Sequence, residues 1–171
     1  MPAKQAPPQV PPTEKIQTFY PRLVQAAGEL NSASDQLAKP IATWEAILKK
    51  LNLGISAWVE LSGSDEGDYW WDRGIGYAKV KDTWGIAIRT RSGTGSGDPN
   101  EEEEQTWPFN EAPRWMRIEA VGKLPDLLEA LLKQAEDTTK KIKVSSTKAS
   151  EYAEALSKIA EDAHVSEQKG R

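Results

Sequence analysis

The chain has 171 residues and a net charge of −4, and it contains no cysteine. This length is sufficient for one domain with a hydrophobic core. The lack of cysteine excludes disulfides, thiolate nucleophiles and zinc–thiolate sites. No stretch approaches the roughly 18 apolar residues of a membrane span, and no apolar run marks a signal peptide at the N-terminus. We therefore expect a cytoplasmic protein without membrane contact, and the negative charge disfavours general nucleic-acid binding.

Both ends of the chain are predicted to be disordered. Residues 1–13 are rich in proline, which favours an extended conformation that adds nothing to a core. Residues 166–171 form the second predicted tail, beyond the last apolar position of a helical pattern. Residues 14–165, between these tails, are predicted to form a single domain.

The first helical segment carries apolar residues in alternating steps of three and four, which is the spacing of a heptad seam. Pro40 interrupts this pattern, and proline inside a helix removes a hydrogen bond and disfavours helix at the preceding residue. We expect a kink or two separate helices there. The seam runs through Ile16, Tyr20, Leu23, Ala27, Leu30, Ser34, Leu37, Ile41, Trp44, Leu48 and Leu51.

Four strands are predicted after this segment, from residues whose apolar and polar character alternates. Residues 62–74 and 92–114 are predicted loops between them, and residues 92–106 are expected to be a flexible acidic stretch. The strands are predicted at 55–61, 75–81, 84–90 and 115–121, with a turn at Asp82-Thr83.

Alternation sorts the central hairpin into two faces. Ile75, Tyr77 and Ile86 belong to a bulky face that we expect to be the core. Gly76 and Ala87 belong to a face with small residues at its centre, where another backbone or a flat ligand could approach closely.

A second helical segment is predicted to start at Leu124-Pro125-Asp126 and to continue to about Ala163. Its seam is weak in the middle, where Ser145-Ser146 has poor helix propensity. If both helical segments break, the pieces fold back on the sheet as a compact α+β domain, which is the form we favour. If both are continuous, they could instead form an antiparallel helical arm.

Known catalytic motifs are not found in this sequence. His164 is the only histidine, which rules out histidine-based triads and metal clusters, and no phosphate-binding loop is present. Acids do gather beside aromatic residues between residues 65 and 73, a pattern that occurs in carbohydrate-active sites and that could also hold a divalent metal. Acids in a Gly/Ser loop are normally solvated, which disfavours such a site.

The candidate binding residues are aromatic or basic and lie on or beside the predicted sheet. A nucleic-acid site on the basic side of the sheet is the main alternative that they allow. They are Tyr69, Trp70, Trp71, Arg73, Arg89, Arg91, Trp107 and Arg114.

We predict an α+β protein, with a short antiparallel sheet of about four strands packed by N- and C-terminal amphipathic helices. The order of its elements is shared by many unrelated domains, so it does not indicate a chemistry. We expect a non-enzymatic protein-interaction or assembly module, without cofactor or metal, that uses the helical seams and the Trp-rich loops. Leu156 and Ile159 are the candidates for self-association.

Overall fold

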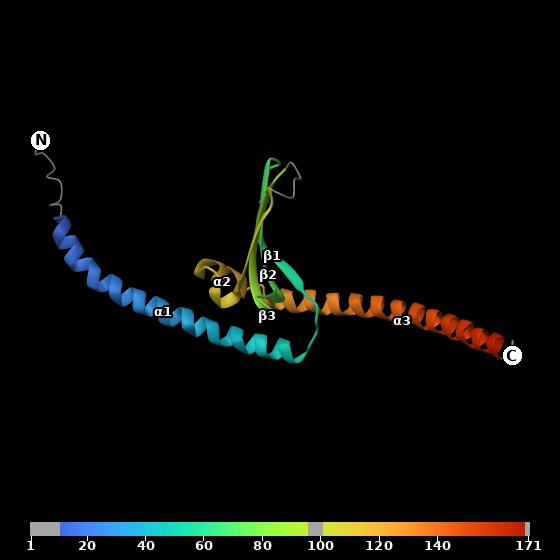
Figure 1. Ribbon diagram of the computed structural model, residues 1–171. Helices are drawn as coiled ribbons and strands as arrows, with labels where there is room; N and C mark the ends of the chain where they lie inside the picture. Colours follow the sequence, from blue (N-terminus) through green and yellow to red (C-terminus); the bar gives the residue numbers. More distant parts are fainter. Residues whose placement is uncertain (1–10, 96–100, 170–171) are drawn as a thin grey trace, which may run out of the picture. The chain divides into compact units, whose positions relative to one another are not determined.

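A computed structural model describes residues 11–95 and 101–169, and the side chains as far as residue 161 (Figure 1). Most of the predicted tail at residues 1–13 lies outside the described residues, as do Gly97 and its neighbours in the predicted flexible stretch. The chain divides into two compact units, the first ending at Ile47 and the second beginning at Leu48. Each unit is described by itself.

Helix α1 (Pro12–Lys50) is one continuous helix of 39 residues that contains both Pro21 and Pro40. The alternative of two separate helices at Pro40 is therefore wrong. Proline has a fixed φ close to the helical value, so its cost is one missing hydrogen bond and a local clash, which a long helix can absorb. Next to Pro40, the Thr43 hydroxyl donates to the Lys39 carbonyl at 3.3 Å.

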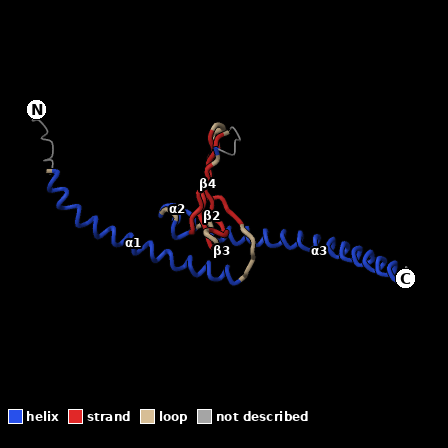
Figure 2. Tube along the Cα trace, viewed as in Figure 1, coloured by secondary structure: helices blue, strands red, loops and turns tan. Residues whose placement is uncertain are grey.

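The second unit is built on a four-stranded antiparallel sheet in which the strands follow one another in chain order (Figure 2). The prediction of an α+β fold with a short antiparallel sheet is confirmed. The strands are β1 (Ala57–Asp65), β2 (Tyr69–Val80), β3 (Thr83–Thr94) and β4 (Glu103–Pro108).

The strands are longer than predicted, and the loop expected at 62–74 is wrong. Ser62 to Asp65 continue β1 and pair with Arg73 to Trp70 of β2, after a bulge between Glu60 and Ser62. Short polar residues and glycine concealed this pairing, because they resemble loop composition. The central turn is also displaced by one residue: Lys81 and Asp82 have φ values of 49° and 64°, as a two-residue hairpin turn requires.

The strand predicted at 115–121 is wrong, because Arg114–Val121 forms helix α2. Pro113 stands before its first turn, and Met116 and Ala120 are buried at helical spacing. The fourth strand is instead β4, which begins inside the predicted flexible acidic stretch. Its glutamates suit an edge strand, where charge discourages pairing with another chain. A short 3-10 turn, Phe109–Glu111, links β4 to α2.

Helix α3 (Leu124–Lys169) runs through Ser145-Ser146 without interruption, so the break predicted there is also wrong. Thr147 and Ser150 donate their hydroxyls to the carbonyls of Lys143 and Ser146, four residues back, which satisfies these polar groups inside the helix. Pro125 lies in the first turn as predicted. Beyond residue 165 the helix extends into the predicted tail.

The core of the second unit lies on the bulky face of the hairpin, as predicted. Ile75, Ile86 and Ile88 are fully buried, and Tyr77 stacks on Trp84 with 5.5 Å between ring centroids. Helix α2 contacts β3, and the start of α3 contacts β1 and β2. From these helices Met116, Ala120, Leu127 and Leu131 are buried. Among the described residues, no helix is long and apolar enough to cross a membrane.

Candidate functional site

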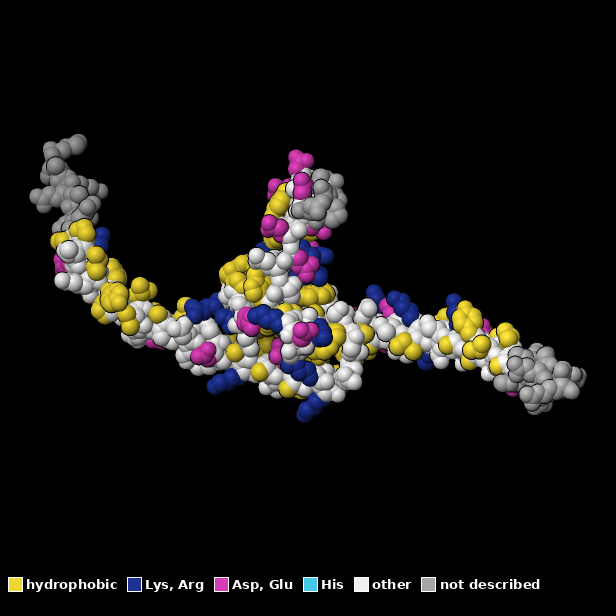
Figure 3. Space-filling view, viewed as in Figure 1, with side chains coloured by type: hydrophobic (Ala, Val, Ile, Leu, Met, Phe, Trp, Pro, Cys, Tyr) yellow, Lys and Arg dark blue, Asp and Glu magenta, His cyan; other side chains and the backbone are white. Residues whose placement is uncertain are grey.

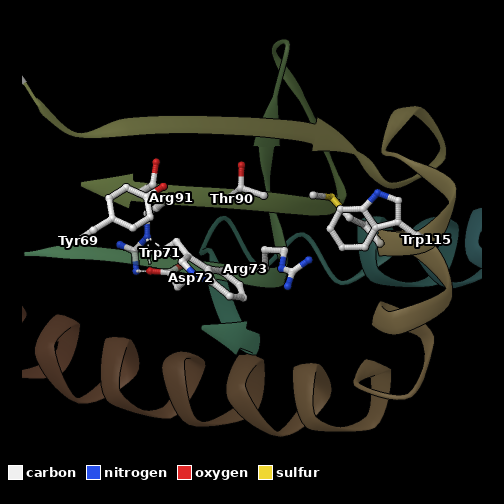
Figure 4. Close-up of a pocket in the computed structure, with 9 residues that line it drawn as sticks. Tyr69, Trp71, Asp72, Arg73, Thr90, Arg91 and Trp115 are labelled. Atoms are coloured by element: carbon white, nitrogen blue, oxygen red, sulfur yellow. Dashed lines mark hydrogen bonds and ion pairs between the residues drawn. The ribbon is translucent and has the colours of Figure 1, made fainter. Parts of the chain in front are cut away.

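An open cavity of about 340 Å³ lies beside β2 and β3, next to the start of α2 (Figure 4). It brings together four of the predicted binding residues, namely Tyr69, Trp71, Arg73 and Arg91. The lining also includes Asp72, Thr90, Ser92, Trp115 and Met116.

The guanidinium of Arg73 is stacked between two indole rings. Its Cζ lies 4.5 Å from the ring centroid of Trp71 and 4.6 Å from that of Trp115. Trp71 and Arg73 are two positions apart on β2, which places their side chains on one face of the sheet. With two indole rings against its guanidinium, the Arg73 side chain is only 20% exposed and has little surface left for a ligand.

Polar contacts around this stack are sparse. Nη1 of Arg73 lies 4.0 Å from Oε2 of Glu119, and the other carboxylate oxygen, Oε1, accepts a hydrogen bond of 2.8 Å from the Ser62 hydroxyl. The Nε of Arg73 is buried without a hydrogen-bond partner. The ring contacts therefore join α2 to β2, and the hydrogen bond between Ser62 and Glu119 joins α2 to β1, as in a structural element of the unit.

Arg91 and Asp72 form an ion pair directly across β2 and β3. Nε of Arg91 donates to both carboxylate oxygens, at 3.2 and 3.0 Å, and Nη2 donates to Oδ2 at 2.6 Å. The hydrogen bonds to Asp72 raise the pKa of Arg91 above its ordinary value. Arg91 is thus engaged within the sheet.

Arg89 occupies the opposite face of the sheet from Arg73. Its Cζ lies 4.1 Å from the centroid of the Trp58 ring, which in turn lies across Gly76. Burial lowers the pKa of Arg89, with a further lowering from the neighbouring charge of Arg91. The Nε of Arg89 is buried without a hydrogen-bond partner. The small-residue face is therefore covered in part by the chain's own indole.

Trp70 points away from the stacked rings, since it alternates with Trp71 along β2. Its ring lies across Gly93 of β3: a Cβ built on that glycine would meet the ring at 2.9 Å. Trp70 lines a second cavity, of about 360 Å³, together with Trp71 and Asp72. Although both tryptophans line this cavity, strand alternation directs their side chains to different faces of the sheet.

The remaining predicted residues are not brought into these cavities. Trp107 lies on β4 opposite Ile88, and Arg114 is the first residue of α2. Leu156 and Ile159 are on α3, where 68% and 67% of their surface is exposed.

Sequence reasoning missed two residues that matter to this geometry, Trp115 and Trp58. Trp115 was placed in a predicted strand, although it contacts Arg73 from a helix. Trp58 was recognised only as part of a strand candidate. Its position opposite Gly76 became visible once the pairing of β1 with β2 was known.

The acidic segment at 65–73 does not converge on one point. Asp65 accepts a hydrogen bond from the Gly67 backbone at 3.0 Å, which stabilises the turn, and Asp72 is paired with Arg91. In the part of the chain that the structure describes, no group of three or more acids or histidines could hold a metal. These acids serve local structure.

Apolar side chains also line a hollow of about 610 Å³ on α1, within the first unit. Ile16, Phe19, Tyr20 and Leu23 contribute to it, and each has more than half of its surface exposed. The hollow is far more apolar in its lining than the cavities on the sheet. It follows the seam that the sequence predicts.

Comparison of the chain with protein-family models, with curated proteins and with solved structures found no match.

Proposed function

We propose that this chain is a non-enzymatic protein-interaction module whose two long helices carry the contact surfaces. The observation that supports this most directly is the exposed apolar stripe on α1. Apolar side chains in a soluble protein are normally buried or scattered, and a contiguous exposed group marks a contact site.

The stripe on α1 follows the heptad spacing over several turns. Its exposed members are Ile16, Tyr20, Leu23 and Leu30, with Phe19 and Val24 at its borders. The opposite side of the helix is polar, as shown by Gln25, which donates to Glu29 at 2.9 Å. A helix with one apolar and one polar side is suited to bind along a second helix or in a groove.

A second stripe lies on the distal part of α3, where every described side chain from Thr139 to Glu161 is exposed. Ile142, Tyr152, Leu156 and Ile159 form it. Apolar atoms gather along both helices in the space-filling view (Figure 3). An extended helix gains most of its stability from packing its apolar side, so this segment favours a partner.

The alternatives have less support. For nucleic acid, the sheet would need free cationic groups, whereas Arg73 and Arg89 are stacked on indoles and Arg91 is paired with Asp72. For an enzyme or a carbohydrate or metal site at 65–73, the acids would need to converge. The interaction role requires neither condition.

Site-specific photo-crosslinking in native cells tests this proposal. A photoreactive side chain would replace Leu23 or Leu156 on the stripes, and Gln25 or Glu154 on the polar sides as matched controls. We expect protein adducts at the stripe positions and several-fold fewer at the controls. Equal labelling at all four positions, or no adducts at all, would refute the role of the helices.

A further inference from the structure

We infer that the distal stripe of α3 binds a second copy of this chain, with the two helices antiparallel and related by a two-fold axis between Ser150 and Glu151. The inference rests on the proposed interaction role and names its partner. Three independent features of α3 support it: the sizes of the side chains along its seam, the small residues beside the seam and the distribution of charge.

The seam of α3 has small residues in one half and large residues in the other. Ser145 and Ala149 precede the midpoint, whereas Tyr152 and Leu156 follow it. In the antiparallel pair, Ala149 lies opposite Tyr152 and Ser145 lies opposite Leu156 of the second copy. Each large side chain thus meets a small one, as closely packed layers require. Ser145 and Ala149 are small and weaken the seam in a single helix. In the pair, they provide the space that Leu156 and Tyr152 of the second copy fill.

The outer layers of the same arrangement are apolar. Ile142 lies opposite Ile159, and both are exposed in the single chain, by 62% and 67%. Because the axis is two-fold, each pair occurs twice, and the interface is self-complementary. A parallel pair would instead place Ser145 on Ser145 and Tyr152 on Tyr152, which leaves a gap in one layer and crowding in another.

Small residues follow one flank of this seam. Beside the seam, Thr139 of one copy lies next to Ala160 of the other and Ser146 lies next to Ala153, each pair offset by two positions from the seam layers, as in residues that border the contact in a two-helix pair. Short side chains at both members of a flanking pair let the two helices approach closely.

The charges favour the antiparallel direction. From Thr139 to Ala149 the helix carries four lysines and no acid, namely Lys140, Lys141, Lys143 and Lys148. From Ser150 to Glu161 it carries three acids, Glu151, Glu154 and Glu161, against Lys158 alone. Antiparallel pairing sets the basic half of each copy beside the acidic half of the other, whereas parallel pairing sets like charges together.

Cysteine cross-linking tests both the partner and its direction, because the chain has no cysteine of its own. In the antiparallel pair, position 145 of one copy faces position 156 of the other, whereas the two copies of position 145 are about 16 Å apart at a rise of ~1.5 Å per residue. Disulfides need Cα atoms within about 7 Å. The full chain with both Ser145→Cys and Leu156→Cys should therefore form a covalent dimer under oxidation.

Each single variant, Ser145→Cys or Leu156→Cys, should cross-link at least tenfold less than the double variant. Efficient cross-linking of Ser145→Cys alone would overturn the antiparallel direction. The absence of a covalent dimer in the double variant, with a monomer mass in sedimentation equilibrium, would overturn self-pairing altogether.

A variant with Leu156→Gln and Ile159→Gln provides a second measurement on the same chain. We expect it to fall from a dimer mass to a monomer mass, while Thr147→Gln with Ser150→Gln, at uncharged positions away from the seam of α3, keeps the dimer. Near-ultraviolet circular dichroism of the sheet tryptophans checks that the second unit remains folded. An unchanged dimer mass in the seam variant overturns the inference.

The outcomes separate this inference from the proposed function. Photo-crosslinks from Leu156 to other proteins, together with a monomeric chain, would retain the interaction role and overturn self-pairing. A cross-link within one chain, from α3 to α1, would also overturn self-pairing and would favour the predicted helical arm.

Discussion

The indole of Trp58 on β1 lies against Gly76 on β2, its direct partner in the sheet. A Cβ placed on Gly76 would meet two carbons of the Trp58 ring at 2.4 Å and the Ala57 carbonyl oxygen at 2.7 Å. Real contacts of this kind are never so short, so glycine at this position is required by space. The pairing of an aromatic ring with a cross-strand glycine is a known way to protect a sheet where it lacks side chains.

Gly76→Ala should lower the free energy of unfolding by about 1–3 kcal/mol, because the ring or a strand must move. Urea unfolding followed by circular dichroism measures this loss. Gly122→Ala is the matched control: Gly122 has helical backbone angles, and nothing lies within 4 Å of its Cβ position. The control should be neutral or stabilising by about 0.4–1 kcal/mol. Equal effects of the two variants would contradict the close contact.

The ring and the backbone oxygen can be separated with a third variant. Adding Trp58→Ala to Gly76→Ala should cost less than the sum of the two single changes, since the ring no longer clashes with the new methyl. Part of the Gly76 effect should remain, because the Ala57 oxygen stays in place. Strict additivity would indicate that the ring does not set the space at Gly76.

The Asp72–Arg91 pair should contribute modestly to stability. Its side chains are 21% and 41% exposed, so solvent screens the attraction, although the hydrogen bonds to both carboxylate oxygens are well placed. A double-mutant cycle with Asp72→Asn and Arg91→Gln should give a coupling of about 0.5–1 kcal/mol. The coupling is measured from unfolding in urea at low salt, and it should shrink at high salt. A coupling near zero would refute the pair in solution.

The sequence predicted an element correctly where its apolar residues fit only one periodicity, that of a strand or that of a helix. Where they fit both, it did not. Ile75, Tyr77 and Ile86 alternate with glycine and alanine, so the faces of the hairpin followed from the pattern alone. Trp115-Met116-Arg117-Ile118-Glu119-Ala120-Val121 fits both a strand and a helix, because Met116 and Ala120 fall on one side in either case. Only packing against the sheet decides between them.

The helix breaks were mispredicted for a different reason. Pro40 and Ser145-Ser146 lower the local preference for helix, but each affects only a few residues within helices of 39 and 46 residues. Helix formation is cooperative, so a local penalty is offset by the turns on either side. Local propensity could not reveal this.

Of the candidate site, the sequence could predict only which side chains of a single strand share a face. Trp71 and Arg73 are two positions apart, so a strand puts them on the same face. Trp115 reaches Arg73 from a helix about forty residues later, and no short-range pattern reports such a contact. The pairing of Asp72 with Arg91 likewise requires the register of β2 with β3.

Arg73→Lys should destabilise the second unit although it keeps the charge. Lysine lacks the planar group that stacks between Trp71 and Trp115, and each arginine–ring contact is worth about 0.5–1 kcal/mol. We expect a loss of about 1–2 kcal/mol in urea unfolding, with a changed near-ultraviolet spectrum. Arg22→Lys, exposed on α1, is the matched control and should change stability by less than about 0.5 kcal/mol. A loss no larger than that of the control would contradict the stack.

Pro40→Ala should stabilise α1, because Pro40 lies inside a continuous helix. Alanine restores the missing backbone hydrogen bond and removes the clash of the proline ring with the preceding turn, which together cost about 3 kcal/mol in a helix interior. We expect the free energy of unfolding to rise by about 1–3 kcal/mol. The rise should appear as a higher melting temperature in the circular dichroism signal of helix at 222 nm. Pro125→Ala is the matched control, since position 125 lies in the first turn of α3, where a backbone N–H has no partner within the helix and proline therefore removes none of its hydrogen bonds.

The two proline variants together distinguish a continuous helix from a broken one. If α1 were two helices with Pro40 in the first turn of the second, Pro40 would occupy the same kind of position as Pro125. Both substitutions would then be nearly neutral, and the predicted gain at Pro40 would be absent. A gain at Pro40 with none at Pro125 is the result that the continuous α1 requires, because only an interior proline removes a hydrogen bond that the helix would otherwise make.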